Sequence, residues 1–434
     1  MKSIKKLFFL IFLGGLISAG IYYFRDTSGP TISLTPAAGP ISTKVPLSLT
    51  LNDASTGLKI IEVTAIQEGI RMPLISQTAP AETKQIDIIL NLESLKPKQG
   101  ALEIEVVAGD RSIYHLGKGN ISKQSFQLTY DTRPPIISIL SKAHNFTKGG
   151  SGLVTYRLNE EVTTTGVQVG ELFFPGYLQE SGAYISLLAY PFDMPESDFV
   201  PRITATDLAG NERQAGIYYR ANDKTFRQRK INLSNSFLQQ KAPEFESMLP
   251  EPADELGTFL YVNGEIRRQN RAKMVELAGK TAGSALWQGP FVQMHNASAL
   301  AQFADHRTYY YEGKEVDKAV HYGYDLASVA QAEIEAGNRG EVIWADYLGI
   351  YGLCVVIDHG LGLQTLYAHM SQLDVQPGDM VVRGQHLGRS GATGMAGGDH
   401  LHFGVFVAGV AVQPLEWWDE NWLKNNIDSK LQEL

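Results

Sequence analysis

The sequence predicts a mainly β chain with a membrane anchor, two antiparallel β-sandwich domains, a helical connector and an all-β C-terminal domain. An uncharged apolar run opens the chain, short alternating segments between Gly, Pro, Asn and Ser fill most of the rest, and one central segment is rich in helix formers. The expected parts are a cytoplasmic tail at 1–6, a transmembrane segment at 7–24, sandwiches at 26–130 and 131–221, a connector at 222–285 and a C-terminal domain at 286–434.

The composition excludes several classes of function. A chain of 434 residues has room for about two to four domains. Its formal net charge of -8 offers no basic stripe to neutralise phosphates, so we expect no nucleic-acid partner. The single cysteine, Cys354, excludes an internal disulfide framework and a cysteine-based zinc site, and its apolar neighbours predict a place in the core.

The apolar run at residues 7–24 follows three lysines, Lys2, Lys5 and Lys6. In an α-helix, about 18 residues span about 27 Å, which crosses the hydrocarbon core when flanking lysines extend to the headgroups. Lysines in front of the run predict a cytoplasmic N-terminus and a periplasmic body anchored in the inner membrane. A signal peptide cleaved near residues 18–20 is the alternative, which the length of the run disfavours. Both interpretations place the body outside the cytoplasm.

An internal repeat with an offset of about a hundred residues follows. DTSGPTISL begins at Asp26 and DTRPPIISIL begins at Asp131, and each places proline before strand-forming residues. The two units end on EIEVVAGDRS at 103–112 and RITATDLAGNE at 202–212. The phrase ATDLAGN resembles the closing strand and turn of bacterial immunoglobulin-like domains, which implies two antiparallel sandwiches.

From about residue 222 the pattern becomes helical. Polar residues of SNSFLQQKAPEFESML precede helix formers, and a second helix-forming run starts near Asn263 and could end at Gly279. Its basic side chains are expected to form a solvated helix face, with contact to an acidic wall polymer as the alternative: Arg267, Arg268, Arg271 and Lys273. The part of the chain before this connector holds only isolated histidines, His115 and His144, which we expect at the surface or in turns.

The C-terminal part returns to short strands and Gly-rich turns. EVIWAD, LCVVIDHG, QTLYAH, MVVRGQHLG and HLHFGVFV form a close series of expected strands. Most histidines of the chain gather here: His321, His359, His369, His386, His400 and His402.

Several of these histidines have the spacing of a metal site. His321 and Asp325 lie four residues apart and share a face in either a strand or a helix, and His400 and His402 share a face of one strand. A catalytic zinc takes three protein ligands, commonly imidazole and carboxylate, and leaves its fourth position open. His321, Asp325 and one histidine of HLH could supply the three ligands, and the other histidine and His369 would be free imidazoles beside them.

Together these motifs resemble the lysostaphin-like, or LytM-type, zinc endopeptidases. HYGYDLA, LYAHM, VQPGDMVVRGQHLGRSGATG and GGDHLHFGV occur in the family's order over about a third of the chain. The resemblance implies that His321, Asp325 and His402 bind Zn²⁺ and that His369 and His400 form a catalytic pair that does not bind it. It further implies that the substrate is a peptide bond of peptidoglycan and that the protein acts in cell-wall remodelling.

The remaining polar residues of this part are expected to be structural. His359 falls at a turn between strands, and His386 is assigned to the surface or to packing. Tyr367 shares a face with His369 by strand alternation, and a supporting role in the core is at least as well founded as a role in the site.

Two other functions also fit the sequence. The first is a non-hydrolytic LytM-type regulator or scaffold of wall hydrolysis and assembly, whose partners would be divisome or wall-synthesis proteins. The complete ligand set argues against it. The second is a surface adhesion protein whose sandwich repeats carry the function. In an endopeptidase, the segments before the C-terminal domain would serve as a stalk or would occlude the catalytic groove.

Overall fold

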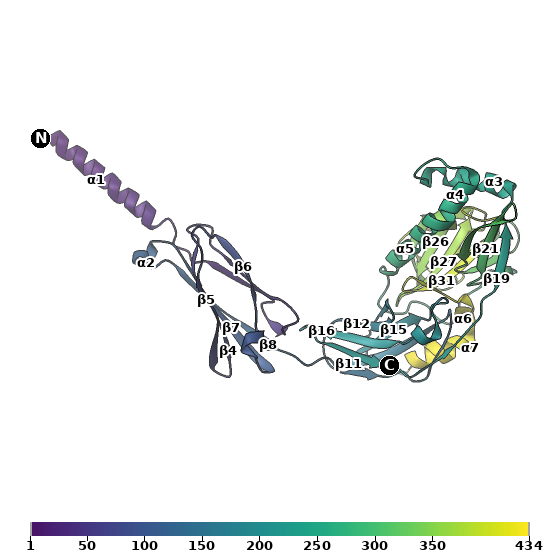
Figure 1. Ribbon diagram of the computed structural model, residues 1–434, viewed down its shortest axis with the longest axis horizontal. Coiled ribbons are helices and arrows are strands. Elements are labelled where there is room, and N and C mark those ends of the chain that lie inside the picture. Colours follow the sequence, from purple (N-terminus) through teal and green to yellow (C-terminus); the bar gives the residue numbers. More distant parts are fainter. Residues whose placement is uncertain (1, 433–434) are drawn as a thin grey trace. The chain divides into compact units, whose positions relative to one another are not determined.

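The computed structural model describes residues 2–432 as a mainly β chain with an apolar N-terminal helix and a helical segment in its middle (Figure 1). Residue 1 of the predicted cytoplasmic tail and residues 433–434 of the predicted C-terminal domain lie outside the described residues. The chain forms two compact units. Of the described residues, the first contains 2–135, 160–163 and 206–213, and the second contains 136–159, 164–205 and 214–432.

The N-terminal helix α1 (Lys2–Tyr23) contains the predicted apolar run. Its segment Ile4–Tyr23 has a mean hydropathy of 1.9 and is long and apolar enough to cross a membrane, with 0% of that segment buried against the rest of the chain. A membrane anchor and a signal sequence both take this form. The predicted apolar helix is therefore present, and its role as a membrane anchor stays a prediction.

Two sheets enclose the core of the first unit. One has the strand order β1-β3-β6, and the other has the order β2-β8-β7-β4-β5. Side chains alternate between core and solvent, so that Leu47, Leu49 and Leu51 of β3 are buried and the residues between them are half-exposed. All pairs are antiparallel except β2 with β8, which pair in parallel at one edge. The strands are β1 (Thr31–Thr35), β2 (Gly39–Ile41), β3 (Leu47–Asn52), β4 (Leu58–Gln67), β5 (Ile70–Thr78), β6 (Gln85–Leu90), β7 (Gly100–Asp110) and β8 (Ile121–Tyr130).

Two four-stranded sheets follow, with the orders β14-β15-β11-β9 and β13-β12-β16-β17. Their strands are β9 (Ile137–Ile139), β11 (Ser151–Leu158), β12 (Val162–Val169), β13 (Leu172–Pro175), β14 (Tyr177–Leu178), β15 (Ala183–Ala189), β16 (Arg202–Asp207) and β17 (Glu212–Gly216). A further pair, β10 (His144–Thr147) and β18 (Tyr219–Asn222), is parallel.

The structure corrects the expected position of His144, because this side chain is only 2% exposed. Its Nδ1–H donates to the carbonyl oxygen of Tyr218 at 2.8 Å, and its Nε2 lies 2.8 Å from the hydroxyl of Ser141. Burial lowers the pKa of His144 to about 4, so the ring is neutral in the core. His115 is exposed, as expected.

The central helices are α3 (Asn235–Phe245), α4 (Glu255–Tyr261) and α5 (Arg267–Ala278), with one π-helical turn, η4 (Val262–Ile266), between the last two. Ser234 and Asp254 cap α3 and α4 by accepting backbone N–H groups, and Gly279 follows the last residue of α5. The predicted connector also contains a strand, β19 (Gln228–Asn232), which pairs in parallel with β21 (His306–Tyr311). The residues of β19 are mostly polar, so the sequence has no apolar alternation there that would predict a strand.

The C-terminal part is built on a sheet with the order β20-β23-β31-β27-β26-β25-β29, with β32 paired to β31. Its strands are β20 (Ser298–Ala301), β23 (Tyr324–Ala327), β25 (Gly340–Tyr347), β26 (Leu353–Asp358), β27 (Leu363–Met370), β29 (Met380–Val381), β31 (Leu401–Val407) and β32 (Val410–Val412). The expected strands are present, although MVVRGQHLG divides into β29 and β30 (His386–Arg389) around a turn. Cys354 is 0% exposed, which confirms its place in the core.

One hydrophobic core runs through the second unit, from the sheets at 137–205 into the C-terminal sheet and its last helices. In α6 (Pro414–Trp418), the buried indole of Trp417 donates to the hydroxyl of Ser151 at 3.2 Å. In α8 (Ser429–Leu431), the ammonium of the buried Lys430 donates to the carbonyl oxygen of Leu153 at 2.9 Å. Most of the region predicted as the second sandwich therefore lies in the same compact unit as the C-terminal domain.

Candidate metal centre

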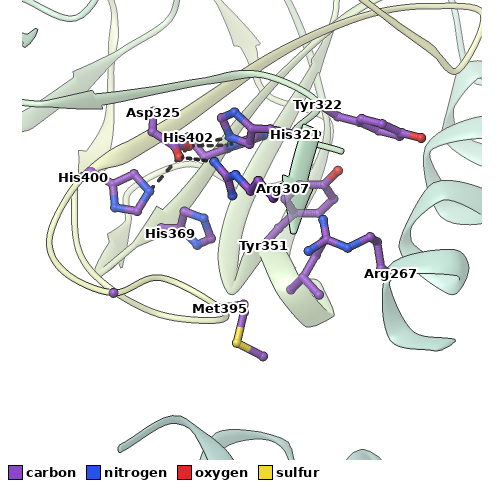
Figure 2. A pocket seen from close by; sticks show the side chains of 12 residues that line it. Arg267, Arg307, His321, Tyr322, Asp325, Tyr351, His369, Met395, His400 and His402 are labelled. Carbon is purple, nitrogen blue, oxygen red and sulfur yellow. Dashed lines mark hydrogen bonds and ion pairs between the residues drawn. The ribbon is translucent and has the colours of Figure 1, made fainter. Parts of the chain in front are cut away.

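Three of the predicted site residues meet on one face of the C-terminal sheet. Asp325 of β23 and His402 of β31 are register partners on antiparallel strands, so their side chains lie next to each other. His321, just before β23, places Nε2 at 2.8 Å from Asp325 Oδ1 and 2.9 Å from His402 Nδ1. His402 Nδ1 lies 2.9 Å from the same Asp325 oxygen (Figure 2). Three potential ligand atoms thus converge on one point.

The surroundings of these atoms fit a metal ion. His321 Nδ1–H donates to the carbonyl oxygen of Gln302 at 2.9 Å, so Nε2, the acceptor nitrogen of an imidazole in this tautomer, faces another acceptor, Asp325 Oδ1. Two facing acceptors are satisfied by a cation between them. An outer N–H held by a carbonyl is also usual for metal-binding histidine, and the donor set of two imidazoles and one carboxylate suits zinc.

Arg307 of β21 holds the other oxygen of the carboxylate. Its Nη2–H donates to Asp325 Oδ2 at 3.0 Å, which leaves Oδ1 directed at His321 and His402. Arg307 lies 18 residues before Asp325 on a different strand. No local spacing pointed to it, and sequence reasoning missed it.

His400 and His369 complete a group of four imidazoles around the carboxylate. His400 Nε2 lies 3.6 Å from Asp325 Oδ1, and its Nδ1–H donates to the carbonyl oxygen of Gly398 at 2.8 Å. His369 Nδ1–H donates to the carbonyl oxygen of Thr393 at 2.9 Å. The ring centroids of His369 and His400 are 4.8 Å apart. In both rings a backbone carbonyl fixes the outer nitrogen, and both rings line the pocket that holds the three converging atoms.

Strand alternation gave the wrong neighbour for His369. Tyr367 is the register partner of Phe403, their rings are 5.3 Å apart, and Tyr367 does not line the pocket. His369 reaches the opposite face because its φ is 63°, in the left-handed region that a non-glycine residue rarely adopts. Such backbone strain costs about 1–3 kcal/mol and is held in place by surrounding structure.

Electrostatic interactions differ among the buried groups. Burial opposes ionisation of Asp325, but the histidines around it, first of all His321, outweigh burial and hold its pKa well below the usual value. Burial lowers the pKa of His369 well below 6.5, and His400 and His402 add to that effect. For His400 burial acts in the same direction, but the hydrogen bond and charge of Asp325 outweigh it and raise the pKa. The neutral imidazole of His369 thus lies beside that of His400, which binds a proton more readily.

The pocket has a volume of about 140 Å³. Besides the four histidines and Asp325, its lining includes Arg307, Tyr322, Tyr351, Met395 and, from the helical segment, Arg267. The expected solvated face of four basic residues is therefore wrong for part of the set. Arg268 is exposed and pairs with Glu265, whereas Arg271 lies over the ring of Tyr322 at 4.6 Å and Arg267 points to the pocket. The helical periodicity of the sequence alone does not predict which side of α5 faces the C-terminal sheet.

The remaining histidines of this part lie outside the pocket. His359 is 0% exposed, donates Nδ1–H to the carbonyl oxygen of Arg339 at 2.7 Å and lies 2.7 Å from the hydroxyl of Thr365. His386 lies half-exposed between Asp374 and Glu333. Both positions agree with the structural roles expected for them.

A protein-family model and several curated proteins match part of this sequence. The model of peptidase family M23 matches residues 319–414. The peptidoglycan DD-endopeptidase ShyA of Vibrio cholerae is 36% identical over 98 residues, which are 23% of this chain and 23% of that protein. The murein hydrolase activator EnvC of Escherichia coli is 39% identical over 95 residues, 22% of this chain and 23% of that protein.

Solved structures also match part of this chain. The catalytic domain of lysostaphin from Staphylococcus simulans is 26% identical, with a TM-score of 0.24, and the match covers 28% of this chain and 92% of that one. The chain spans less than a quarter of the length of ShyA and of EnvC. The matches to the family model, to ShyA and to EnvC leave the N-terminal region unidentified.

Proposed function

Since residues 319–414 form a domain of peptidase family M23, we propose that the protein is a zinc-dependent endopeptidase that hydrolyses peptide bonds in peptidoglycan. One observation carries the proposal: His321 Nε2, Asp325 Oδ1 and His402 Nδ1 converge within 2.9 Å of one another beside two further imidazoles. The three side chains would hold a zinc ion, and a catalytic zinc commonly takes three protein ligands of these types.

The three converging side chains would hold the zinc ion. A bound zinc polarises a carbonyl group and makes hydroxide available near neutral pH. Arg307 and Gln302 keep Asp325 and His321 in the orientation that binding requires, because each holds the atom of the ligand that faces away from the metal.

His369 and His400 would act on protons and on the developing negative charge. Each has its Nδ1–H fixed by a backbone carbonyl, so Nε2 is the atom that accepts or donates a proton on the pocket side. A positioned imidazole of this kind contributes about 10² to 10⁴ in rate. His369 and His400 are the catalytic pair of this proposal.

Digestion of purified sacculi by the full chain tests the proposal. Zinc-loaded protein is expected to release muropeptides, and a chelator is expected to stop the release. His369→Ala and His400→Ala should keep zinc and lose digestion, whereas His402→Ala should lose zinc. His386→Ala, outside the pocket, serves as the matched control. If His400→Ala lost zinc and His402→Ala kept it, the roles within the HLH pair would be reversed.

We extend the proposal to the rest of the chain. Helix α1 anchors the protein in the inner membrane with a cytoplasmic N-terminus, and the body works in the periplasm on the cell wall. The sheets within 26–130 and 131–221 form immunoglobulin-like sandwiches that dock divisome or wall-synthesis proteins. Fractionation of the membrane and protease protection of a tagged N-terminus test the topology.

A non-hydrolytic regulator of wall hydrolysis is the second candidate, because EnvC, which is 39% identical over 95 residues, is named as an activator. The complete set of His321, Asp325, His369, His400 and His402 argues against it. Zinc-loaded protein that leaves sacculi intact but stimulates a separate hydrolase would favour the regulator.

A further inference from the structure

Two arginines line the metal-site pocket, and both lie outside the stretch that matches the family model. Arg267 is the first residue of α5 in the helical segment, and Arg307 belongs to β21 (Figure 2). The pocket lining contains two guanidinium groups and a single carboxylate, Asp325. With a divalent cation bound as well, the pocket has an excess of positive charge.

Asp325 can neutralise only one of the two arginines. Arg307 donates to its Oδ2 at 3.0 Å, and these two side chains are 18% and 12% exposed. The other oxygen of the same carboxylate faces His321 and His402. The charge of Asp325 is thus shared between Arg307 and the metal site, and none of it is left for Arg267.

Arg267 is held in place without a counter-ion. Its Nε–H donates to the carbonyl oxygen of Asn263 at 3.1 Å, and its Nη2–H donates to the side-chain oxygen of Asn263 at 2.7 Å. Asn263 is fixed in turn by Asp317, to which its amide donates at 2.7 Å. Within residues 2–432, no carboxylate oxygen lies within 4.0 Å of the Arg267 guanidinium.

The environment makes this unpaired charge costly. Burial lowers the pKa of Arg267, and the neighbouring Arg307 and Arg271 lower it further, while only tyrosines act in the opposite direction. The Arg267 side chain is half-buried, and a partly desolvated cation is stabilised when an opposite charge reaches it. A guanidinium presents a planar fork of N–H donors that matches a carboxylate, so a ligand carboxylate is the group that suits this position.

We propose that Arg267, together with Arg307, forms an anion subsite that binds a free carboxylate of the peptide substrate. The subsite selects peptides with a free carboxylate near the scissile bond over those in which it is a carboxamide. This inference rests on the proposed function, because it assumes that the pocket receives a peptide. Arg267 thereby gives the helical segment a direct part in substrate selection.

Binding to a zinc-loaded, non-cleaving protein tests the subsite. The probes are muropeptide dimers from sacculi and the same dimers with their carboxyl groups amidated, titrated calorimetrically into full-length His400→Ala protein. The carboxylate form is expected to bind about tenfold to a hundredfold more tightly than the amide, as usual for a charged hydrogen-bonded pair. Arg267→Gln in the same background should remove this difference, because it weakens binding of the carboxylate form far more than binding of the amide form.

Matched variants separate selection from a structural role. Arg268→Gln removes a neighbouring, exposed charge and should keep the full preference. Arg267→Lys keeps the charge, should retain part of the preference, and provides the measurement if the Gln variant does not fold. An arginine that only braces the helical segment would change the binding of both probes equally.

Several outcomes would overturn the subsite: equal binding of the two probes, an undiminished preference in Arg267→Gln, or no binding of either probe. The proposed function fails on a different result, which is intact sacculi after incubation with zinc-loaded wild-type protein. A preference for carboxylate in calorimetry can coexist with that result, so the two failures are distinguishable.

Discussion

Glu416 of α6 gives the second unit a pH-dependent stability that a single substitution should remove. Its Oε2 accepts the backbone N–H of Ser151 at 2.8 Å and the hydroxyl of Ser151 at 3.1 Å. Burial nevertheless raises the pKa of Glu416 from 4.5 to about 8. Between these two values the folded chain binds a proton that the unfolded chain has lost, so the free energy of unfolding falls as pH rises.

The magnitude follows from the one proton involved. One proton corresponds to about 1.4 kcal/mol per pH unit, so between pH 5.5 and 7.5 Glu416 should lower the free energy of unfolding by about 2–3 kcal/mol. In Glu416→Gln the amide oxygen can accept the same two hydrogen bonds and cannot ionise. The variant should match the wild type near pH 5 and exceed it in stability by about 2–3 kcal/mol at pH 7.5.

Urea unfolding followed by tryptophan fluorescence measures this difference. All the tryptophans of the chain lie at residues 287–422, within the second unit, so the signal reports that unit. Glu420→Gln, at an exposed position in α7 (Glu420–Leu423), is the control and should follow the wild type at every pH. Parallel stability curves for the wild type and Glu416→Gln from pH 5.5 to 7.5 would refute the reasoning.

Three further results are expected. Arg307→Gln should weaken zinc binding by about ten- to a hundredfold in competition with a chromophoric chelator, because the ligand carboxylate loses its orienting partner, while the exposed Arg389→Gln should have no effect. Unchanged affinity in the first variant would contradict that role. His359→Ala should lower the free energy of unfolding by about 1–3 kcal/mol through its lost hydrogen bonds and should keep full zinc content per folded chain. Tyr367→Phe should cost about 1–3 kcal/mol in stability and leave digestion of sacculi intact, and a loss of digestion without unfolding would place Tyr367 in the site after all.

The sequence could predict those parts of the site that depend on local spacing. Alternation within HLH puts His400 and His402 on one face, and the spacing from His321 to Asp325 allows both to reach it. His369 was expected near the site, but alternation misplaced Tyr367 beside it. The left-handed φ of His369 turns its side chain to the opposite face of the strand from Tyr367. A pattern of residue types does not predict the backbone angle of a single residue.

The parts that the sequence did not predict depend on contacts between distant segments. Arg267 and Arg307 reach the pocket from a helix and a strand that carry no motif. The contact of Trp417 with Ser151 joins residues 266 positions apart within the second unit. The burial of His144 depends on a distant contact as well, because one of its two hydrogen-bond partners is Tyr218, 74 residues away. Such contacts are set by packing and not by local periodicity.

The most direct measurement is mass analysis of the fragments released from purified sacculi by zinc-loaded and by zinc-stripped full-length protein. We expect muropeptides with newly cleaved peptide bonds only from the zinc-loaded protein, and no such fragments when His402, as His402→Ala, no longer completes the ligand set. Fragments that appear equally with zinc-stripped protein, or intact sacculi with fully zinc-loaded wild-type protein, would contradict a zinc endopeptidase at this site.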